Sequence, residues 1–402
     1  MSAPVIVTLN AGSSSLRCAV FDRTPDGPTL RLRLGLRGLP ERMIWERHAP
    51  RTNTTATRTL APPDPPAKAQ DIARATMLKL LLAEIDASEI AVVAHRVVHG
   101  GQNYGAPVVV DRDILCALDK LSPLAPGHQP HNLAAIRALA ERFPQIVQIA
   151  CFDTRFHHSL SPNDRIFALP KHLIDAGIMR YGFHGLSYEH IATTLAKSAP
   201  ALAAGRVIVA HLGHGASMCA MQDGRSVATT MGMTALDGLP MGRRSGSLDP
   251  GILLYLIEEI GMTPAAVRQM LYERSGLLGL SGISGEMTTL LASDDPNAAR
   301  AVDYFIYRCQ REIGSLSAAL GGIDGLVFTG GMGVHAHEIR KRICAGLGWL
   351  GVVLDENANQ NGDRNLSAQA ASVETLLIAT NEEAVLARHA EALLTARKPA
   401  MP

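Results

Sequence analysis

The chain has few aromatic residues and almost no net charge. Phe, Trp and Tyr make up 4% of its 402 residues, and 38 Lys and Arg balance 37 Asp and Glu to a formal net charge of +1. Proteins that bind nucleic acid usually present a basic surface with aromatic side chains that stack on bases, and an anionic membrane also attracts a basic face. The composition therefore argues against both nucleic acid and membrane partners.

Long apolar runs and paired cysteines are missing as well. No segment reaches the roughly 18 apolar residues of a membrane span, and the start, MSAPVIVTLN, lacks the basic region and apolar length of a signal peptide. The six cysteines are widely scattered and none forms a CxxC pair, so neither a zinc site nor a disulfide framework is supported. We expect free thiols and a cytoplasmic location.

The chain does contain apolar strands that alternate with helices, in two halves. In the first half we expect strands at 5–10, 16–22, 30–39, 89–101 and 145–152, helices at 67–86 and 129–142, and a polar, Pro-rich loop over 50–68. In the second half we expect strands at 206–213, 325–331 and 374–380, a hairpin turning at Asp223-Gly224, and helices at 188–195, 251–261, 263–275, 298–320, from 335, and 382–394. The shared pattern predicts a duplicated α/β architecture with helix-covered mixed sheets and a ligand site in the cleft between two domains.

Four Gly- and Ser-rich turns follow apolar runs. The chain has no GxxxxGK[ST] phosphate loop and no complete GxGxxG fingerprint, so phosphates would be held another way. Backbone amides and hydroxyls in such turns can bind phosphate, whereas any single turn could equally be a simple reversal of the chain. The four turns are NAGSSS, HLGHGAS, SGISG and TGGMG.

Charged and imidazole side chains stand near these turns. Asp153 follows a buried-type run in FDTRFHH, and His184 lies in MRYGFHGLSYEH. Arg96 and Arg244 suit bidentate binding of carboxylate or phosphate, although a structural salt bridge would also explain either one. Together, these side chains indicate a site for phosphoryl transfer. In the alternative interpretation, His184 and His211 are histidines of the core whose hydrogen bonds are satisfied there.

The segment IATNEEAVLARHAEALL begins the last expected helix. Thr380 and Glu383 have the T-x-x-E spacing of a capping box, which gives Glu383 a structural role. Glu382 then remains at the first turn. It either interacts with the helix dipole or serves as a Mg²⁺ ligand.

In order and spacing, these segments resemble the acetokinase family, within the actin, Hsp70 and sugar-kinase superfamily. The matching segments are NAGSSSLR, HRVVHGG, LAPGHQPHN, FDTRFH, YGFHGLSYEHI, HLGHGAS, MGMTALDGLPMGRRSG, DPG, GLLGLSGIS, GLVFTGGMG and TNEE. The resemblance implies two actin-like (ribonuclease H-like) domains, each with a βββαβαβα core, MgATP in the interdomain cleft, and a homodimer. It implies a first domain over 1–153, completed by a C-terminal helix at 383–402, and a nucleotide-binding domain over 154–382.

The resemblance also implies a reaction and a role for each matched residue. The reaction is reversible transfer of the ATP γ-phosphoryl group to acetate, giving ADP and acetyl phosphate, a precursor for acetyl-CoA biosynthesis. The implied catalytic residues are Asp153, His184 and Arg244, and the implied substrate-binding residues are Arg96, Val98, Gly127 and Phe183. Nucleotide contacts are implied for Arg17, His211, Leu212, Gly213, His214, Gly215, Glu286, Gly331, Met332, Gly333, Val334 and His335, and Mg²⁺ or Mn²⁺ binding for Asn10 and Glu382. Because a carboxylate with a pKa of about 4 is already ionised at neutral pH, we expect Asp153 to orient Arg96 or the acyl group rather than to act as a base.

Several positions depart from the family pattern. Arg17 replaces a Lys and His214 an Asn, Val334 and His335 replace Glu-Asn, and Glu286 and Thr288 stand near a usual Asp and Arg, which leaves base preference open. Gly127 stands where Leu is usual, beside the implied acyl pocket. A propionate or butyrate kinase is therefore the alternative within the enzyme class, and a non-catalytic nucleotide-binding switch is the alternative from another class.

Overall fold

The computed structural model describes residues 4–12, 15–39, 41–65 and 68–397. The chain folds into two compact units. The N-terminal unit comprises Met1–Arg155 and Asn381–Pro402, and the C-terminal unit comprises Phe156–Thr380. Among the described residues, no helix has the length and hydrophobicity needed to cross a membrane.

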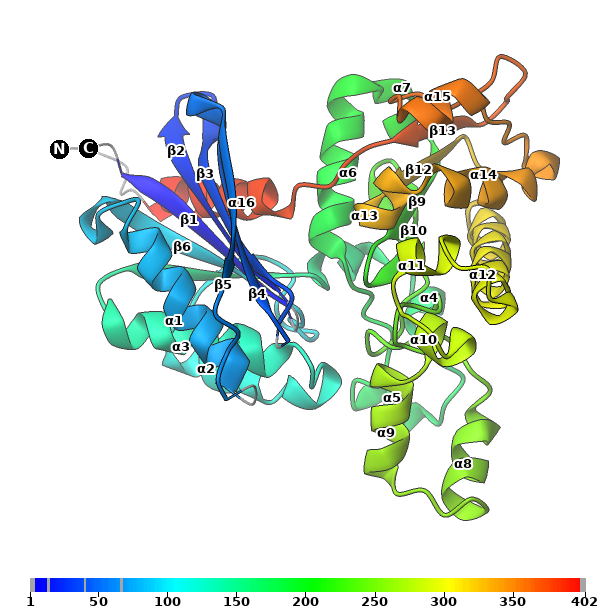
Figure 1. Cartoon of the computed structure of the whole chain (residues 1–402), viewed down its shortest axis with the longest axis horizontal. Helices are drawn as coiled ribbons and strands as arrows, with labels where there is room; N and C mark the ends of the chain where they lie inside the picture. The colour runs from blue at the N-terminus through cyan, green and yellow to red at the C-terminus, as the bar shows by residue number, and fades with distance from the viewer. Residues whose placement is uncertain (1–3, 13–14, 40, 66–67, 398–402) are drawn as a thin grey trace. The chain divides into compact units, whose positions relative to one another are not determined.

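The N-terminal unit is built on one mixed sheet with strand order β5-β4-β3-β2-β1-β6-β8-β7 (Figure 1). Its strands are β1 Val5–Ala11, β2 Ser15–Thr24, β3 Gly27–Arg37, β4 Met43–Ala49, β5 Thr54–Leu60, β6 Ile90–Val97, β7 Val108–Val109 and β8 Val147–Phe152. Its helices are α1 Ala69–Leu82, α2 Arg112–Asp119, α3 Gln129–Arg142 and α16 Glu382–Arg397. The strands from β1 to β5 form an antiparallel meander, whereas β1, β6 and β8 run parallel to one another.

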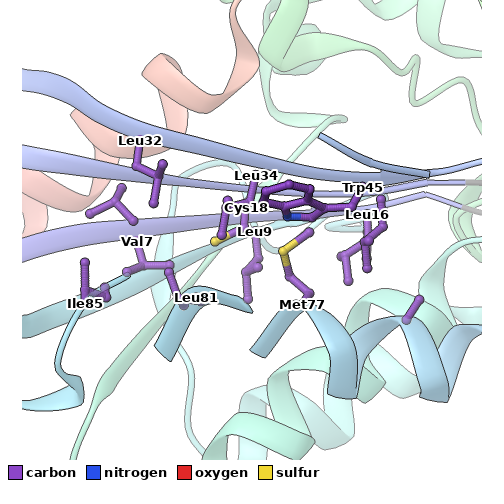
Figure 2. Close-up of a cluster of buried hydrophobic side chains, with 14 of the residues drawn as sticks. Val7, Leu9, Leu16, Cys18, Leu32, Leu34, Trp45, Met77, Leu81 and Ile85 are labelled. Atoms are coloured by element: carbon purple, nitrogen blue, oxygen red, sulfur yellow. The ribbon is translucent and has the colours of Figure 1, made fainter. Parts of the chain in front are cut away.

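Both faces of this sheet carry apolar side chains, because successive strand residues point to opposite faces, and each face is covered by helices. Val7 and Leu9 of β1 pack with Met77 and Leu81 of α1 in one buried cluster, and Figure 2 shows these side chains facing one another. Because successive strand residues point to opposite faces, Ile6 points away from that cluster, and it is fully buried as well. The opposite face is covered by α16, which packs against β1, β3 and β6 (Figure 1).

The C-terminal unit contains a five-stranded sheet with order β11-β10-β9-β12-β13. Its strands are β9 Arg206–Leu212, β10 Ala216–Gln222, β11 Arg225–Thr229, β12 Gly325–Thr329 and β13 Glu374–Leu377. Its helices are α4 Pro162–Arg165, α5 Lys171–Asp175, α6 Gly185–Ser198, α7 Pro200–Ala203, α8 Pro250–Glu258, α9 Pro264–Glu273, α10 Gly276–Ser281, α11 Met287–Leu291, α12 Pro296–Leu320, α13 Gly330–His335, α14 His337–Ala345 and α15 Glu356–Asn361.

The two sheets share one topology. In chain order, the core strands β1, β2, β3, β6 and β8 of the N-terminal unit correspond to β9, β10, β11, β12 and β13 of the C-terminal unit. Each set begins with an antiparallel meander and ends with two strands parallel to the first. This confirms the duplicated α/β architecture predicted from the sequence.

The two units exchange helices. α6 follows the last core strand of the N-terminal unit in sequence, yet its Tyr188, Ile191 and Leu195 pack on β9 and β10 of the C-terminal unit. Conversely, α16 follows β13 of the C-terminal unit and covers the N-terminal sheet. Each sheet is therefore covered by a helix whose sequence follows the core strands of the other unit.

Two local predictions were wrong. The segment 50–68, expected as a loop, contains β5, which pairs with an unexpected strand, β4. Its sequence TTATRTL has no apolar alternation, because β5 is an edge strand whose residues are mostly exposed. The capping box at Thr380 is also absent. The side chain of Asn381 instead accepts a hydrogen bond from Ala384 N at 3.1 Å, and Thr380 Oγ1 is buried without a hydrogen-bond partner in the described part of the chain.

Other predicted boundaries shift by a few residues or lie partly outside the described residues. The predicted hairpin turn at Asp223-Gly224 is confirmed, with φ values of 51° and 68°. In the NAGSSS turn, Ser13 and Ser14 lie outside the described residues, as do residue 67 of the first predicted helix and 398–402 of the last.

Candidate active site

Four polar side chains gather at the carboxyl ends of the parallel strands of the N-terminal unit. Asn10 ends β1 and Arg96 lies in the adjacent β6, while Asp153 follows the next strand, β8. Arg96 donates to both carboxylate oxygens of Asp153 from Nε, at 3.1 and 3.0 Å, and to Asn10 Oδ1 from Nη1, at 3.1 Å. Glu382, from the first turn of α16, accepts from Asn10 Nδ2 at 2.9 Å. Ligands of α/β proteins commonly bind at this edge of a sheet.

Because Arg96 and Asp153 are buried together, the pKa of each depends strongly on the charge of the other. Asp153 is 1% exposed. Burial raises its pKa above the ordinary value, while Arg96 opposes that shift. Burial by itself would lower the pKa of Arg96, but Asp153 and then Glu382 hold it above its ordinary value. We infer that Asp153 is ionised in this pair and holds a charged guanidinium in a fixed orientation.

Two buried amides from α3 fix the loop that follows β6. Gln129 accepts from His99 N and donates to His99 O, each at 3.0 Å. Asn132 accepts from Val98 N at 3.1 Å and donates to Ala11 O at 2.7 Å. Neither residue was predicted to have a role, although both lie in the LAPGHQPHN segment. Their polarity on an otherwise apolar helix face was the available signal.

The residues predicted to line an acyl pocket differ in exposure. Val98 is 3% exposed and so packs inside the N-terminal unit. Gly127 is exposed, and a Cβ added there would have no atom within 4 Å. Arg17 is exposed on β2, in register with Asn10 of β1.

In the C-terminal unit, His184 has a left-handed backbone conformation, and a relay of two hydrogen bonds runs from its ring to Ser217 and Tyr188. It precedes α6 in the left-handed region, with φ of 59°. His184 Nδ1 lies 2.8 Å from Ser217 Oγ, which lies 2.5 Å from Tyr188 Oη. Burial raises the pKa of Tyr188 well above its ordinary value, so its phenol stays protonated. If Tyr188 donates to Ser217 and Ser217 donates to Nδ1, the proton of the neutral imidazole sits on Nε2.

His211 and Arg244 lie close to this histidine. The His184 and His211 rings stack with centroids 4.4 Å apart, and His211 Nδ1 lies 2.8 Å from Ser187 Oγ. Arg244 is oriented by its Nη1, which donates to Ala235 O at 2.7 Å. A Cβ built on Gly215 would lie 3.1 Å from His184 Nε2 and 3.2 Å from Arg244 Nη2. Three cationic or hydrogen-bonding side chains therefore converge on the turn after β9.

The predicted nucleotide loops meet at the ends of β9 and β12. Gly330 has φ of 79°, and a Cβ there would lie 2.6 Å from Leu212 O, so only glycine fits. This contact sets the start of α13, which carries Gly331, Met332, Gly333, Val334 and His335. A Cβ on Gly213 would lie 3.9 Å from Gly331 N, which places the two turns next to each other.

A buried arginine supports α13 from behind. Arg340 is 1% exposed and donates to Gly333 O at 2.9 Å and Val334 O at 2.8 Å. It also donates to the side chain of Asn359 at 2.8 Å. Burial lowers its pKa below the ordinary value. Arg340 was not predicted as a site residue, because no motif surrounds it in the sequence.

The other positions that depart from the family pattern lie in the C-terminal unit, and most of them are exposed. His214 and Glu286 are both exposed, with His214 Nε2 3.9 Å from Glu286 Oε1. His335 and Thr288 are also exposed, whereas Val334 is half-buried.

His157 holds the backbone next to His184. His157 is 1% exposed, and its Nε2 lies 2.9 Å from Phe183 O while its Nδ1 lies 2.8 Å from Ser226 Oγ. Phe183, predicted to bind substrate, has a side chain that is 2% exposed and packs in the core. Through the Phe183 carbonyl, His157 fixes the peptide that leads into His184.

The donor set at Asn10 and Glu382 can be tested against Mg²⁺. No group of three or more His, Cys, Asp or Glu among the described residues is arranged to hold a metal ion. Mg²⁺ in nucleotide enzymes commonly takes one or two carboxylates, with water and phosphate oxygens completing its shell. The carboxylate of Glu382 in the first turn of α16 and the amide oxygen of Asn10 fit an ion that arrives with a nucleotide, once the Asn10 amide turns its oxygen from Arg96 toward Glu382.

The acetokinase family model matches residues 5–388. An acetate kinase from Rhodopseudomonas palustris (strain TIE-1) is 49% identical over 390 residues, covering 96% of this chain and 97% of that protein. The solved structure of a propionate kinase from Francisella tularensis subsp. tularensis SCHU S4 has a TM-score of 0.86 and 33% identity, over 96% of this chain and 98% of that one. An acetate kinase structure from Porphyromonas gingivalis has a TM-score of 0.82 and 29% identity, over 98% of this chain and 100% of that one. Similarity over nearly the whole sequence and fold, together with the strand-end residues described above, shows that the chain belongs to the acetokinase family.

Proposed function

We propose that the protein catalyses reversible transfer of the γ-phosphoryl group of ATP to acetate, giving acetyl phosphate and ADP. The observation that carries this proposal is that His184 Nε2 and Arg244 Nη2 lie 3.1 and 3.2 Å from the position that a Cβ would take on Gly215, in a turn rich in glycine. Hydrogen-bond donors aimed at one point suit the equatorial oxygens of a phosphoryl group in transfer. Membership of the acetokinase family supports the same reaction.

The chemistry requires alignment and charge stabilisation. An oxygen of acetate attacks the γ-phosphorus, a P–O bond forms, and the bond to the β–γ bridging oxygen breaks with its electron pair left on ADP. No proton has to be removed from acetate, because its carboxylate is ionised near neutral pH. The bidentate Arg96–Asp153 pair supports an orienting role for Asp153, with Arg96 binding the acyl carboxylate or the phosphoryl group.

The histidines would act as hydrogen-bond donors. With its Nδ1 bonded to Ser217, His184 would donate from Nε2 to an oxygen of the moving phosphoryl group. His211 would contact a phosphate from the adjoining strand end, and Arg244 would neutralise charge that develops in the transition state. The glycine turns at 211–215 and 331–335 would bind the nucleotide phosphates through backbone amides.

Asn10 and Glu382 would hold Mg²⁺ or Mn²⁺ delivered with ATP. A divalent cation there would supply neutralisation of the phosphate oxygens. The role of the chain is to offer the amide oxygen and the carboxylate at one strand end and to keep Arg96 beside them. His214 and Glu286 would border the nucleotide base.

The reaction is tested by trapping acyl phosphate with hydroxylamine in the presence of ATP, Mg²⁺ and acetate. We expect hydroxamate formation with the native protein and strong loss with His184→Ala, through kcat far more than through KM. Absence of hydroxamate with carboxylates of two to four carbons would overturn the proposal and leave the nucleotide-binding switch as the better account.

Propionate or butyrate is the second candidate acceptor. The open space around Gly127 favours it, since an added Cβ would touch nothing within 4 Å. One methylene in an apolar pocket changes discrimination by about 1–3 kcal/mol. A series from acetate to butyrate, repeated with Gly127→Leu, decides between them. Preference for longer acids that Gly127→Leu abolishes supports the larger pocket, and an unchanged acetate preference contradicts it.

We also propose a cytoplasmic homodimer that uses α8. None of the residues of this helix is buried, and Leu254 and Tyr255 are each 58% exposed. An apolar helix face of this kind usually marks a protein interface. The six cysteines are free, and five are buried, which fits a reducing compartment.

A further inference from the structure

The N-terminal unit contains a cavity of about 700 Å³ between α1, α3 and the sheet. This volume falls within the roughly 300–1,000 Å³ of small-molecule sites. None of the residues given a role in the proposed reaction lines the cavity. It is therefore a separate feature of this unit, and Figure 2 shows part of its wall, with Met77 and Leu81 of α1 facing Val7, Leu9 and Leu16.

The wall of the cavity is mostly apolar. Its floor is formed by strand residues of β1, β2 and β6, and its sides by one face each of α1 and α3. Small residues of α3, Ala134, Ala135 and Ala138, leave room that larger side chains would fill. Partly exposed Leu78, Leu82 and Leu139 also line it, so apolar surface stays open to a ligand.

The charged residues that line the cavity are predominantly basic. Arg74, Lys79, Arg137 and Arg142 outnumber Asp71 and Glu141, and Arg137 is paired with Asp119 of α2. Arg74 Nη2 is paired with Asp71, but its Nη1 is buried and has no hydrogen-bond partner among the described residues. Arg142 lies over the ring of Phe143, 5.7 Å from its centroid, at the end of α3. An apolar pocket with guanidinium groups at its wall is complementary to an apolar chain that ends in an anion.

We propose that this cavity binds a long-chain carboxylate. The alkyl chain lies against the leucines and alanines of α1 and α3, and the carboxylate pairs with Arg74, whose Nη1 is buried without a hydrogen-bond partner among the described residues. Short carboxylates lack the apolar area to bind there, so the ligand class differs from the proposed acyl substrates.

The test is calorimetric titration of the full chain with dodecanoate, with ADP and butyrate present at saturation to occupy the proposed active site without turnover. We expect one dodecanoate per chain and an affinity that rises about fourfold for each methylene added from decanoate onward. Ala138→Trp fills the cavity and should weaken binding at least tenfold. Ala140→Trp, on the same helix but outside the lining, is the matched control and should bind as the native protein does.

A second experiment tests the contact between the carboxylate and the guanidinium group. Dodecanol should bind more weakly than dodecanoate, and Arg74→Gln should lose roughly fivefold in dodecanoate affinity but nothing for dodecanol. Arg112→Gln on α2, outside the lining, is the control.

Two outcomes would overturn the proposal. If Ala138→Trp binds dodecanoate like the native protein, the ligand is not in this cavity, and Ala134→Phe repeats this test should Ala138→Trp fail to fold. Equal affinity for dodecanol and dodecanoate overturns the assignment of an anionic head group. Neither result depends on turnover, so the outcome is separate from that of the proposed kinase reaction.

Discussion

Asp153 is the residue whose proposed orienting role rests on the most direct contact in the structure. An acid at the end of a buried strand needs a partner, and Arg96 supplies a bidentate one. The role that we propose for Asp153 is to fix the guanidinium, because acetate needs no base.

Asp153→Asn should therefore lower kcat on the order of a hundredfold, since Arg96 loses its anchor and the charge balance of the site changes. Asp119→Asn, which breaks an exposed Arg–Asp pair with Arg137, is the control and should stay within about twofold of the native rate. Steady-state kinetics with acetate and ATP measure both. Near-native turnover of Asp153→Asn would contradict the orienting role.

A second prediction concerns the relay behind His184. Ser217→Ala removes the hydroxyl that fixes the Nδ1 side of the ring, so kcat should fall about tenfold with little change in KM for ATP. Tyr188→Phe should act in the same direction but less, because it acts one hydrogen bond further away. Ser198→Ala, at the exposed end of α6, should be silent. A rise in KM alone would assign Ser217 to nucleotide binding instead.

At the residue scale, the sequence indicates groups that must be exposed or partnered. Asp153 and Arg96 follow from charge at strand ends, whereas His184 follows from the motif YGFHG before a predicted helix. Ser217, Tyr188, Gln129 and Asn132 are common residue types whose roles depend on contacts between distant segments, so a linear pattern does not mark them. His157 illustrates the same limit, because its contact with the Phe183 carbonyl spans 26 positions.

At the scale of elements, the turn from β12 into α13 depends on one glycine. Gly330→Ala would place a Cβ 2.6 Å from Leu212 O at a φ of 79°. The left-handed backbone alone costs about 1–2 kcal/mol, so we expect a lower thermal unfolding midpoint and a higher KM for ATP. Gly331→Ala meets no atom within 4 Å and is the matched control for stability. Equal unfolding midpoints for the two variants would refute this account.

The apolar face of α8 leads to a prediction about assembly. The double variant Leu254→Glu, Tyr255→Glu should convert the protein to a monomer, because two exposed apolar side chains at the proposed interface become charged. Arg268→Glu, on the neighbouring α9, serves as a charge control. Sedimentation equilibrium measures the mass, and a variant that keeps the native mass would place the interface elsewhere.

Elements with strong periodicity or turn signals were predictable, whereas edge elements were not. The buried strands around Val7, Val93 and Val209 are rich in consecutive apolar residues, and the Asp223-Gly224 pair is typical of a turn. β5 lacks such a signal because Thr55 and Thr57 face solvent. Its strand conformation is stabilised by backbone pairing with β4 rather than by burial of apolar side chains.

At the scale of the whole molecule, each unit contains a histidine that is buried in the neutral form. Burial lowers the pKa of His95 to about 4, although its bond to Gln148 opposes the shift. Burial likewise lowers the pKa of His157 to about 4. In the unfolded chain both would titrate near 6.5.

Because the folded pKa values are depressed, protonation favours unfolding. The stability that these histidines contribute is complete above pH 6.5 and is lost as pH falls toward 4, by up to about 3 kcal/mol for each residue. Urea unfolding at pH 7.5, 6 and 5 should show this decline, and His157→Gln should flatten it. Constant stability between pH 7 and 5 would contradict the prediction.

The duplication itself was predictable because both halves repeat the same order of strands and glycine turns. The exchange of α6 and α16 could not be read from periodicity, since an amphipathic helix does not specify which sheet it covers. Tyr188, Ile191 and Leu195 would suit either sheet by hydrophobicity alone.

The exchange of helices has a consequence during synthesis on the ribosome. The N-terminal sheet emerges first, but α16, which buries Val385 and Leu386 against that unit, is translated after the whole C-terminal unit. One apolar face of the nascent N-terminal sheet therefore stays uncovered until α16 has been translated. The C-terminal sheet differs, because α6 is translated before the strands that it covers. Translation order thus predicts that the later-made unit reaches its native packing first, and that a ribosome stalled before Glu382 carries a chain dependent on chaperones.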